Sequence, residues 1–209
     1  LYHLIFVVKI KNNMRVCILG AGLSSLTLAK ALVNQNIYVD IYAQKNINLP
    51  DKSRTIGISK SNIDFFNNSI INVDKISWKL KKIEIFSENL CKEKLINFEN
   101  NGNQLLSIIH NYKLFKILEK NLFKNKYFKK KKYQKNLNIL KNYNLIINTD
   151  LGNSIAKKHF SPKILKEYNS IAYTTLIRHE KINNDVAVQI FTKRGPLAFL
   201  PISEKETSV

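Results

Sequence analysis

The chain has 209 residues, of which 44% are hydrophobic and 10% aromatic, so it can bury a core as one large or two small domains and is not an intrinsically disordered polymer. Its formal charge of +19 points to nucleic acid, anionic lipid or an acidic partner. However, its 34 basic residues include only four arginines, at Arg15, Arg54, Arg178 and Arg194. Because nucleic-acid-binding faces rely on arginine, we attribute the charge to a Lys-, Asn- and Ile-rich coding bias and expect no nucleic-acid partner.

The sequence gives no support for a disulfide-bonded, a metal-binding or a membrane-spanning protein. Cys17 and Cys91 show no CxxC or metal-ligand spacing, so we predict reduced, structural cysteines and no metal site. The apolar stretch at residues 1–8 is too short to span a bilayer and no basic region precedes it, which argues against a membrane helix or a signal peptide. We interpret residues 1–13 as an upstream or disordered remnant, because Met14 stands directly before the first strand.

The segment Met14–Lys30 (MRVCILGAGLSSLTLAK) predicts a strand, a tight glycine turn and a helix. Such a turn directs backbone N–H groups and the positive end of the helix dipole toward one point, which suits a pyrophosphate. Gly20 permits the turn, and Gly22 lets a phosphate approach the backbone. Ser25 takes the place of the third glycine of GxGxxG, where a small residue lets helix and strand pack closely. An ordinary glycine turn in a βαβ unit is the competing interpretation.

Residues 36–42 (NIYVDIY) alternate as a second strand does. In nucleotide-binding βαβ units an acidic residue closes this strand and binds the ribose hydroxyls. Here the closing residue is Ala43. Asp40 lies three positions earlier, so it should point to the opposite face and is no substitute.

The middle of the chain predicts alternating strands and helices. We expect strands at residues 55–59, 78–86, 95–98 and 104–109, with an amphipathic helix at 113–123. A helix should begin near Asn62 and be capped by Ser61. Arg54 is an isolated arginine in a lysine-rich region, which suggests a planar contact that lysine cannot supply, although a plain surface position explains it too.

A lysine-dense segment, residues 124–135 (KNKYFKKKKYQK), follows this helix. Aromatic residues between lysines can indicate a single-stranded nucleic-acid site. The segment is short and lacks arginine, so we favour a solvated hairpin or linker.

The last part of the chain predicts an antiparallel sheet. A strand at residues 143–149 leads to Asp150, and Ser161–Pro162 should start a short helix. We expect residues 171–180 and 185–192 to form a hairpin, and residues 195–202 to form a third strand with an unpaired edge.

Taken in order, several segments together resemble one family, the flavin-dependent aromatic hydroxylases, and in particular its ubiquinone-biosynthesis monooxygenase group. ILGAGLSSLTLAKAL resembles the FAD-binding βαβ unit, and SRTIGISKSNIDFF resembles RxIALSxSS, with Arg54 at the arginine that lies along the flavin. IIHNYKLFKIL resembles VVENRxLxxxL, TDLGNSIAKK resembles ADGANSxVR, and VAVQIFTKRGPLAFLPIS resembles the strand pair that ends in GPLALLPL.

The chain also departs from the family pattern. Ala43, Tyr112, Leu151 and Lys157 stand where the family has an acidic residue, an arginine, a glycine and an arginine. The family's later GDAAH-like motif is absent, since the sequence ends at Val209 first. We therefore expect either a fragment or a protein that has lost part of its site.

The resemblance implies an α/β (α+β) fold, in which a Rossmann-like FAD-binding domain is interleaved with an antiparallel substrate-binding sheet and the C-terminal part is missing. The FAD-binding portion would comprise residues 14–80 and 107–160, and the substrate sheet residues 81–106 and 161–209. The cofactor-binding residues that it implies are Gly20, Gly22, Leu23, Ser25, Arg54, Asn111 and Asp150. No catalytic acid or base follows from it, because the flavin carries the chemistry.

The resemblance further implies an FAD-dependent monooxygenase that uses NADH or NADPH and O2 to hydroxylate a hydrophobic, polyprenylated phenol in ubiquinone biosynthesis. Such an enzyme would be cytoplasmic, or peripheral at the inner membrane surface or in a ubiquinone-biosynthesis complex. The alternatives are another FAD-dependent oxidoreductase such as a prenyl reductase, an inactive fragment, or a basic module that binds nucleic acid or anionic membrane.

Overall fold

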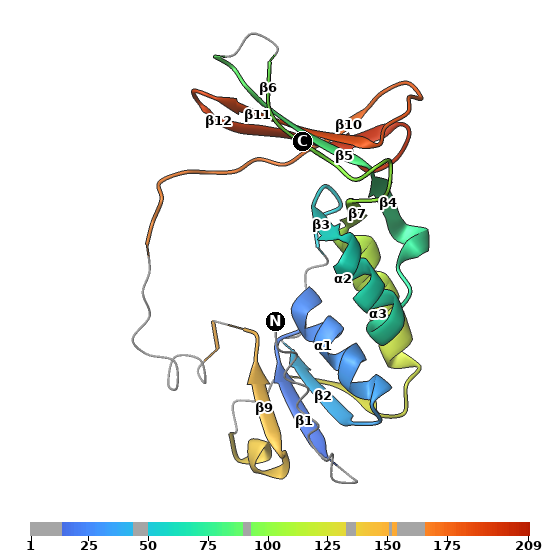
Figure 1. Cartoon of the computed structure of the whole chain (residues 1–209). Coiled ribbons are helices and arrows are strands. Elements are labelled where there is room, and N and C mark those ends of the chain that lie inside the picture. The colour runs from blue at the N-terminus through green and yellow to red at the C-terminus, as the bar shows by residue number, and fades with distance from the viewer. Residues whose placement is uncertain (1–13, 44–49, 90–92, 133–136, 151, 154–165) are drawn as a thin grey trace, which may run out of the picture. The chain divides into compact units, whose positions relative to one another are not determined.

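A computed structural model describes residues 14–43, 50–89, 93–132, 137–150, 152–153 and 166–209 (Figure 1). The chain divides into two units: Leu1–Ile47 with Lys120–Lys163, and Asn48–Glu119 with Ile164–Val209. Each unit joins two stretches that are far apart in the sequence. The predicted α/β class with both parallel and antiparallel sheets is confirmed.

The first unit is a parallel four-stranded sheet with the order β8-β2-β1-β9. Its strands are β1 (Arg15–Leu19), β2 (Tyr38–Ala43), β8 (Phe128–Lys132) and β9 (Leu145–Asn148). The helix α1 (Leu23–Asn34) joins β1 to β2 and packs on both (Figure 1). A 3₁₀ helix, Leu137–Asn142, precedes β9.

Apolar alternation explains the helix-covered face of this sheet. Val16, Ile18, Val39 and Ile41 are fully buried, and α1 contributes the buried Leu26, Ala29 and Val33. After α1, Asn36 adopts a left-handed φ of 58° and its N–H donates to the carbonyl of Val33, which ends the helix.

The lysine-dense segment is not the solvated hairpin that we predicted. Its residues Phe128–Lys132 form β8, which pairs parallel to β2 at the edge of the sheet. Phe128 is buried and anchors the strand, while lysines suit an edge because their charge blocks pairing with another chain.

The second unit contains a small antiparallel sheet with the order β3-β7-β4. Its strands are β3 (Thr55–Ser59), β4 (Ser77–Leu80) and β7 (Leu106–His110), and the helices α2 (Lys60–Phe65) and α3 (Asn111–Phe123) follow β3 and β7. A π-helical turn, Phe66–Ile70, and a 3₁₀ turn, Asp74–Ile76, lead from α2 to β4. The predicted cap of α2 was wrong: Ser59, not Ser61, accepts the N–H of Asn62, at 3.4 Å.

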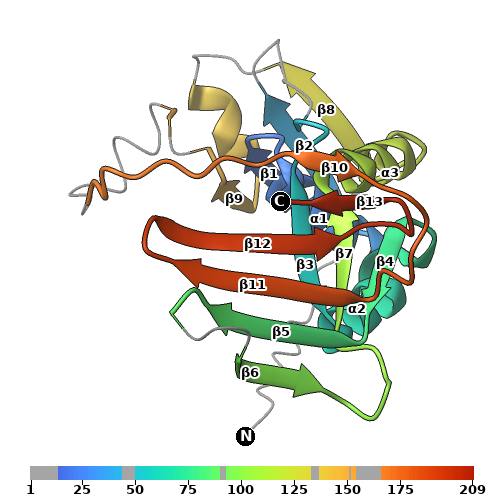
Figure 2. The same ribbon diagram turned by 90° about the horizontal axis from the view of Figure 1, so that it is seen from above.

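The second sheet of this unit has six strands in the order β10-β13-β12-β11-β5-β6, which lie side by side in Figure 2. They are β5 (Lys82–Ser87), β6 (Lys94–Glu99), β10 (Leu176–Arg178), β11 (Val186–Thr192), β12 (Gly195–Pro201) and β13 (Glu206–Ser208). All neighbours are antiparallel except β11 and β5. The two sheets share one hydrophobic core. It contains Leu80 and Ile108 from the small sheet together with Ala187 and Ile202.

Three predictions about strands need correction. The predicted strand 78–86 is two strands, because the N–H of Lys81 leaves the ladder to donate to the Asp185 carbonyl at 2.9 Å. The predicted hairpin does not form, since β10 pairs with β13 and β11 pairs with β12. The predicted unpaired edge at β12 is covered in part: β11 pairs along one side, and on the other side β13 pairs with the last two residues, Leu200 and Pro201.

Some predictions fall outside the described residues, namely the remnant at residues 1–13, the state of Cys91 and the helix starting at Ser161–Pro162. Among the residues that are described, Cys17 is a buried free thiol, and no group of side chains could hold a metal ion. No helix in the described parts is both long and apolar enough to cross a membrane.

Candidate cofactor site

The glycine turn follows β1 at the carboxyl end of the parallel sheet, where α/β proteins bind ligands. Gly20 has a φ of +110° and its N–H donates to the Tyr42 carbonyl at 2.9 Å. A Cβ on Gly20 would lie 2.5 Å from Thr149 Oγ1 and 3.3 Å from Asp150 Cβ. Only glycine therefore fits this position, both for its conformation and for its space.

Gly22 is different, because it has an ordinary extended conformation with a φ of −76°. A Cβ on Gly22 would meet no atom of the described residues within 4 Å, so packing within the part that the structure describes does not demand glycine there. The space above Gly22 lies at the start of α1. Glycine at this position keeps that space clear of a side chain.

The start of α1 lacks the groups that usually neutralise a helix N-terminus. No side chain of the described residues caps it, and its first turn, which begins at Leu23, has no acidic residue. The N–H groups of such a turn and the helix dipole attract an anion. With the open space at Gly22, this turn can accept a diphosphate.

Thr149 is a site residue that our sequence analysis did not single out. Its hydroxyl lies 2.6 Å from Ser25 Oγ and donates to the Leu19 carbonyl at 2.9 Å, so it joins the ends of β1 and β9 to α1. Ser25 is fully buried. A hydroxyl residue directly before Asp150, at the end of a predicted strand, was the available signal.

Asp150 lies beside Gly20 at the end of β9. Its Oδ1 accepts the N–H of Gly152 at 3.0 Å, and its own N–H donates to Asn148 Oδ1 at 3.2 Å. The carboxylate thus shapes its own turn. Leu151, where the family resemblance implies a glycine, is outside the described residues.

The position of the missing ribose-binding acid is as predicted. Ala43 ends β2 and is buried, whereas Asp40 lies on the other face of the sheet. There Asp40 Oδ2 accepts hydrogen bonds from Lys131 Nζ at 2.7 Å and from the Tyr143 hydroxyl at 2.5 Å. Asp40 is therefore committed to a different network.

Arg54 and Asn111 belong to the second unit, and the backbone N–H of Asn111 donates to the Arg54 carbonyl at 3.0 Å. Arg54 is exposed. Hydrogen bonds from Ser53, together with the charge of Arg54, lower the pKa of the neighbouring Asp51 carboxyl. The Asn111 Oδ1 atom is buried and has no hydrogen-bond partner among the described residues, which leaves an acceptor ready for a ligand donor.

His179, which directly follows β10, has a structural role. Its Nδ1 lies 2.7 Å from the Glu180 carbonyl and its Nε2 lies 3.0 Å from Thr207 Oγ1. Asn184 donates to the Ser203 carbonyl at 2.8 Å in the same cluster, and Trp78 Nε1 donates to the Asn184 carbonyl at 2.6 Å. These bonds hold the turns around β13 together.

Neither a protein-family model nor a curated protein matches the sequence. Solved structures do match the fold. PqsL from Pseudomonas aeruginosa, described as a probable FAD-dependent monooxygenase, superimposes with a TM-score of 0.67 at 10% identity, over 94% of this chain and 59% of its own. HpxO from Klebsiella pneumoniae, solved with FAD and uric acid, gives 0.66 at 12% identity, over 93% and 55%.

A third similar structure is 2,6-dihydroxypyridine-3-hydroxylase from Arthrobacter nicotinovorans, with a TM-score of 0.66 at 15% identity, over 94% of this chain and 56% of its own. The chain therefore has the fold of FAD-dependent monooxygenases. It spans between 55% and 59% of the length of PqsL, HpxO and the pyridine hydroxylase.

Proposed function

We propose that this protein is an FAD-dependent monooxygenase that hydroxylates the ring of a polyprenylated phenol in ubiquinone biosynthesis, with NADH or NADPH as reductant and O2 as oxidant. The observation that carries the proposal is the turn at Gly20–Ser25, which has an uncapped helix start and clear space at Gly22. The fold shared with HpxO, whose structure contains FAD, supports the same cofactor.

The described residues fit the diphosphate part of FAD. Backbone N–H groups of Gly22, Leu23 and Ser25 would bind the diphosphate, while Gly20 and Thr149 fix the shape of the turn. Asp150, beside this turn, would orient the rest of the dinucleotide. In the second unit, Arg54 and the unpaired Asn111 Oδ1 would contact the flavin part, as the family resemblance implies.

FAD, once reduced, supplies the activation of O2, and the protein supplies position and a dry environment. The six-stranded sheet offers apolar surface for this purpose. The face that carries the buried Ala187 continues across the sheet with the exposed Ile96, Phe98 and Phe191. A prenylated ring would cover such side chains. The family resemblance also implies a peripheral position at a membrane surface, where a prenylated substrate would reside.

Gly22→Leu tests the cofactor site. The added side chain should fill the space that the diphosphate needs, so flavin per chain after reconstitution and gel filtration should fall by about tenfold or more. Because φ at Gly22 is ordinary and the Cβ meets nothing, the fold should persist, which circular dichroism can verify. Thr27→Leu, one turn further along α1, is the matched control and should retain flavin. Full flavin content in Gly22→Leu would exclude this placement.

Arg54→Lys tests the second unit. Loss of a bidentate, charge-assisted contact should weaken FAD binding by about tenfold in a fluorescence titration. Equal affinities would make Arg54 a plain surface residue.

The reaction is tested by oxygen consumption, oxidation of NADH or NADPH, and mass analysis of a prenylated phenol incubated with the flavin-loaded protein. Monooxygenation adds one oxygen atom derived from O2. Addition of two hydrogens without oxygen uptake would instead identify a prenyl reductase. Colourless protein that binds nucleic acid in a steeply salt-dependent manner would support the basic-module alternative.

A further inference from the structure

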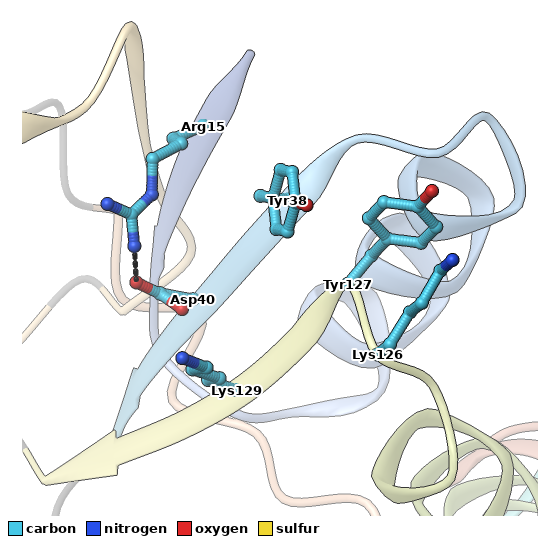
Figure 3. A pocket seen from close by; sticks show the side chains of 6 residues that line it. All are labelled: Arg15, Tyr38, Asp40, Lys126, Tyr127 and Lys129. Atoms are coloured by element: carbon cyan, nitrogen blue, oxygen red, sulfur yellow. Dashed lines mark ion pairs between the residues drawn. The ribbon is translucent and has the colours of Figure 1, made fainter. Parts of the chain in front are cut away.

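A hollow lies in the first unit, at the end of the parallel sheet opposite to the glycine turn. It has a volume of about 260 Å³ and is lined by Arg15, Tyr38, Asp40, Lys126, Tyr127 and Lys129 (Figure 3). Arg15 and Tyr38 are the first residues of β1 and β2 and are paired in register. The hollow therefore belongs to the amino ends of the strands, whereas the proposed FAD site belongs to their carboxyl ends.

The charges around this hollow do not balance. Asp40, the one acid among the described residues that line it, already accepts a hydrogen bond from Lys131 Nζ at 2.7 Å and lies 3.7 Å from an Arg15 nitrogen. Lys126 and Lys129 add two more cations, so three basic side chains, those of Arg15, Lys126 and Lys129, line the hollow together with one carboxylate. Cations that are gathered in a concave site raise the local potential and concentrate anions there.

The hollow is held in shape by the backbone. The N–H of Val39 donates to the Tyr127 carbonyl at 2.8 Å, and the N–H of Tyr127 donates to Asn125 Oδ1 at 2.9 Å. The rings of Tyr38 and Tyr127 meet edge to face with centroids 4.9 Å apart, and Lys126 Nζ lies 5.1 Å from the Tyr127 ring centre. These contacts position Lys126 before any ligand arrives, which lowers the entropic cost of binding.

We propose that this hollow binds a phosphate group, either on a small soluble compound or on the headgroup of an anionic lipid. The guanidinium of Arg15 offers paired donors that match phosphate oxygens, and Lys126 and Lys129 add point charges. A volume of about 260 Å³ suits one phosphate with a small attached group and is below that of ordinary drug-sized sites.

The test measures binding of inorganic phosphate to the full 209-residue chain by calorimetry at physiological salt. The double variant Lys126→Gln/Lys129→Gln should weaken binding by about tenfold or more. The matched control, Lys130→Gln/Lys132→Gln, removes the same charge from the other face of β8 and should change affinity by less than about twofold, because exposed charges off the site are screened. Equal losses in both pairs would overturn the proposal, since the effect would then come from overall charge.

Arg15→Lys keeps the charge but loses the planar donor pair, so it should bind phosphate more weakly than the parent protein and more tightly than Arg15→Gln. If either Arg15 variant fails to fold, the Lys126/Lys129 pair still decides, because those lysines lie on a turn and an edge strand.

The source of the phosphate is resolved with vesicles of phosphatidylcholine, with and without phosphatidylglycerol. If the protein binds free phosphate but does not float with phosphatidylglycerol vesicles, the ligand is a soluble phosphate compound. Flotation with phosphatidylglycerol vesicles that depends on Lys126 and Lys129 assigns a lipid headgroup, and both outcomes support the proposal. Absence of both, or saturable binding of single-stranded nucleic acid with no phosphate affinity, would overturn it.

Discussion

The two faces of the parallel sheet in the first unit are built from the same strands but are stabilised differently. On the face under α1, Val16, Ile18, Val39 and Ile41 are apolar and fully buried. On the other face, Cys17 is paired in register with Asp40, and a polar network covers the strands instead. On the first face, α1 packs against the strands through apolar contacts. In the described part of the chain, the other face is covered by Leu140 of the short 3₁₀ helix and by Tyr143, which follows that helix, and hydrogen bonds hold this cover in place.

The largest effect should come from the helix-covered face. Leu26→Ala removes a side chain that is 1% exposed and should lower the free energy of unfolding by about 2 to 5 kcal/mol, because a cavity remains under α1. Denaturant unfolding measures this loss. Leu28→Ala, on a less buried flank of α1, should cost less. Equal losses would mean that α1 does not bury one specific face.

The second-largest loss of stability should come from Asp40→Asn on the polar face. The side chain of Asp40 is 6% exposed and pairs with Lys131, so loss of its charge should lower the free energy of unfolding by about 1.5 to 3 kcal/mol. A double-mutant cycle with Lys131→Met isolates this pair. Strictly additive losses would show that the two side chains do not stabilise each other.

A smaller effect is expected from Tyr143→Phe. The Tyr143 hydroxyl donates to Asp40 and lies 3.0 Å from the Tyr42 hydroxyl, and its removal should cost about 1 kcal/mol. Tyr38→Phe is the control, because that hydroxyl lies outside the network on the same face. If Tyr38→Phe costs as much, the network is not what attaches the 3₁₀ helix.

The smallest expected effect on the free energy of unfolding at neutral pH comes from the Cys17 thiol. Burial, followed by the charge of Asp40, raises the pKa of its thiol from 9.0 to about 12. The unfolded chain therefore loses this proton first, so the contribution to stability is complete below about pH 9 and is lost as the pH rises toward 12.

Thiol labelling in a Cys91→Ser background checks this prediction, because the thiolate is the reactive form. At pH 9 the folded protein should react far more slowly than protein in denaturant. Equal rates would mean that Cys17 is open to solvent.

The glycine turn and the buried strands were predictable because local patterns determine them. Gly-Ala-Gly follows an apolar run, and alternation placed Ala43 and Asp40 on opposite faces, as observed. The role of Thr149 was not predictable in the same way, since it depends on β9 lying beside β1 although 124 residues separate Thr149 from Ser25.

Two strands escaped prediction for different physical reasons. In β8 only Phe128 carries a hydrophobic signal, because an edge strand tolerates lysine on both faces. β13 is three residues long and polar, so its pairing with β10 could not be seen from hydrophobic alternation, and the hairpin predicted in its place was wrong.

The contrast between Gly20 and Gly22 also has an evolutionary consequence. Folding alone preserves Gly20, since any side chain there would strike Thr149. Gly22 is free of that requirement, so only selection for a bound ligand would keep it as glycine. Under the proposed function, natural variants that have lost dinucleotide binding should therefore retain Gly20 while Gly22 drifts, and the ratio of changes at these two codons would record whether binding is under selection.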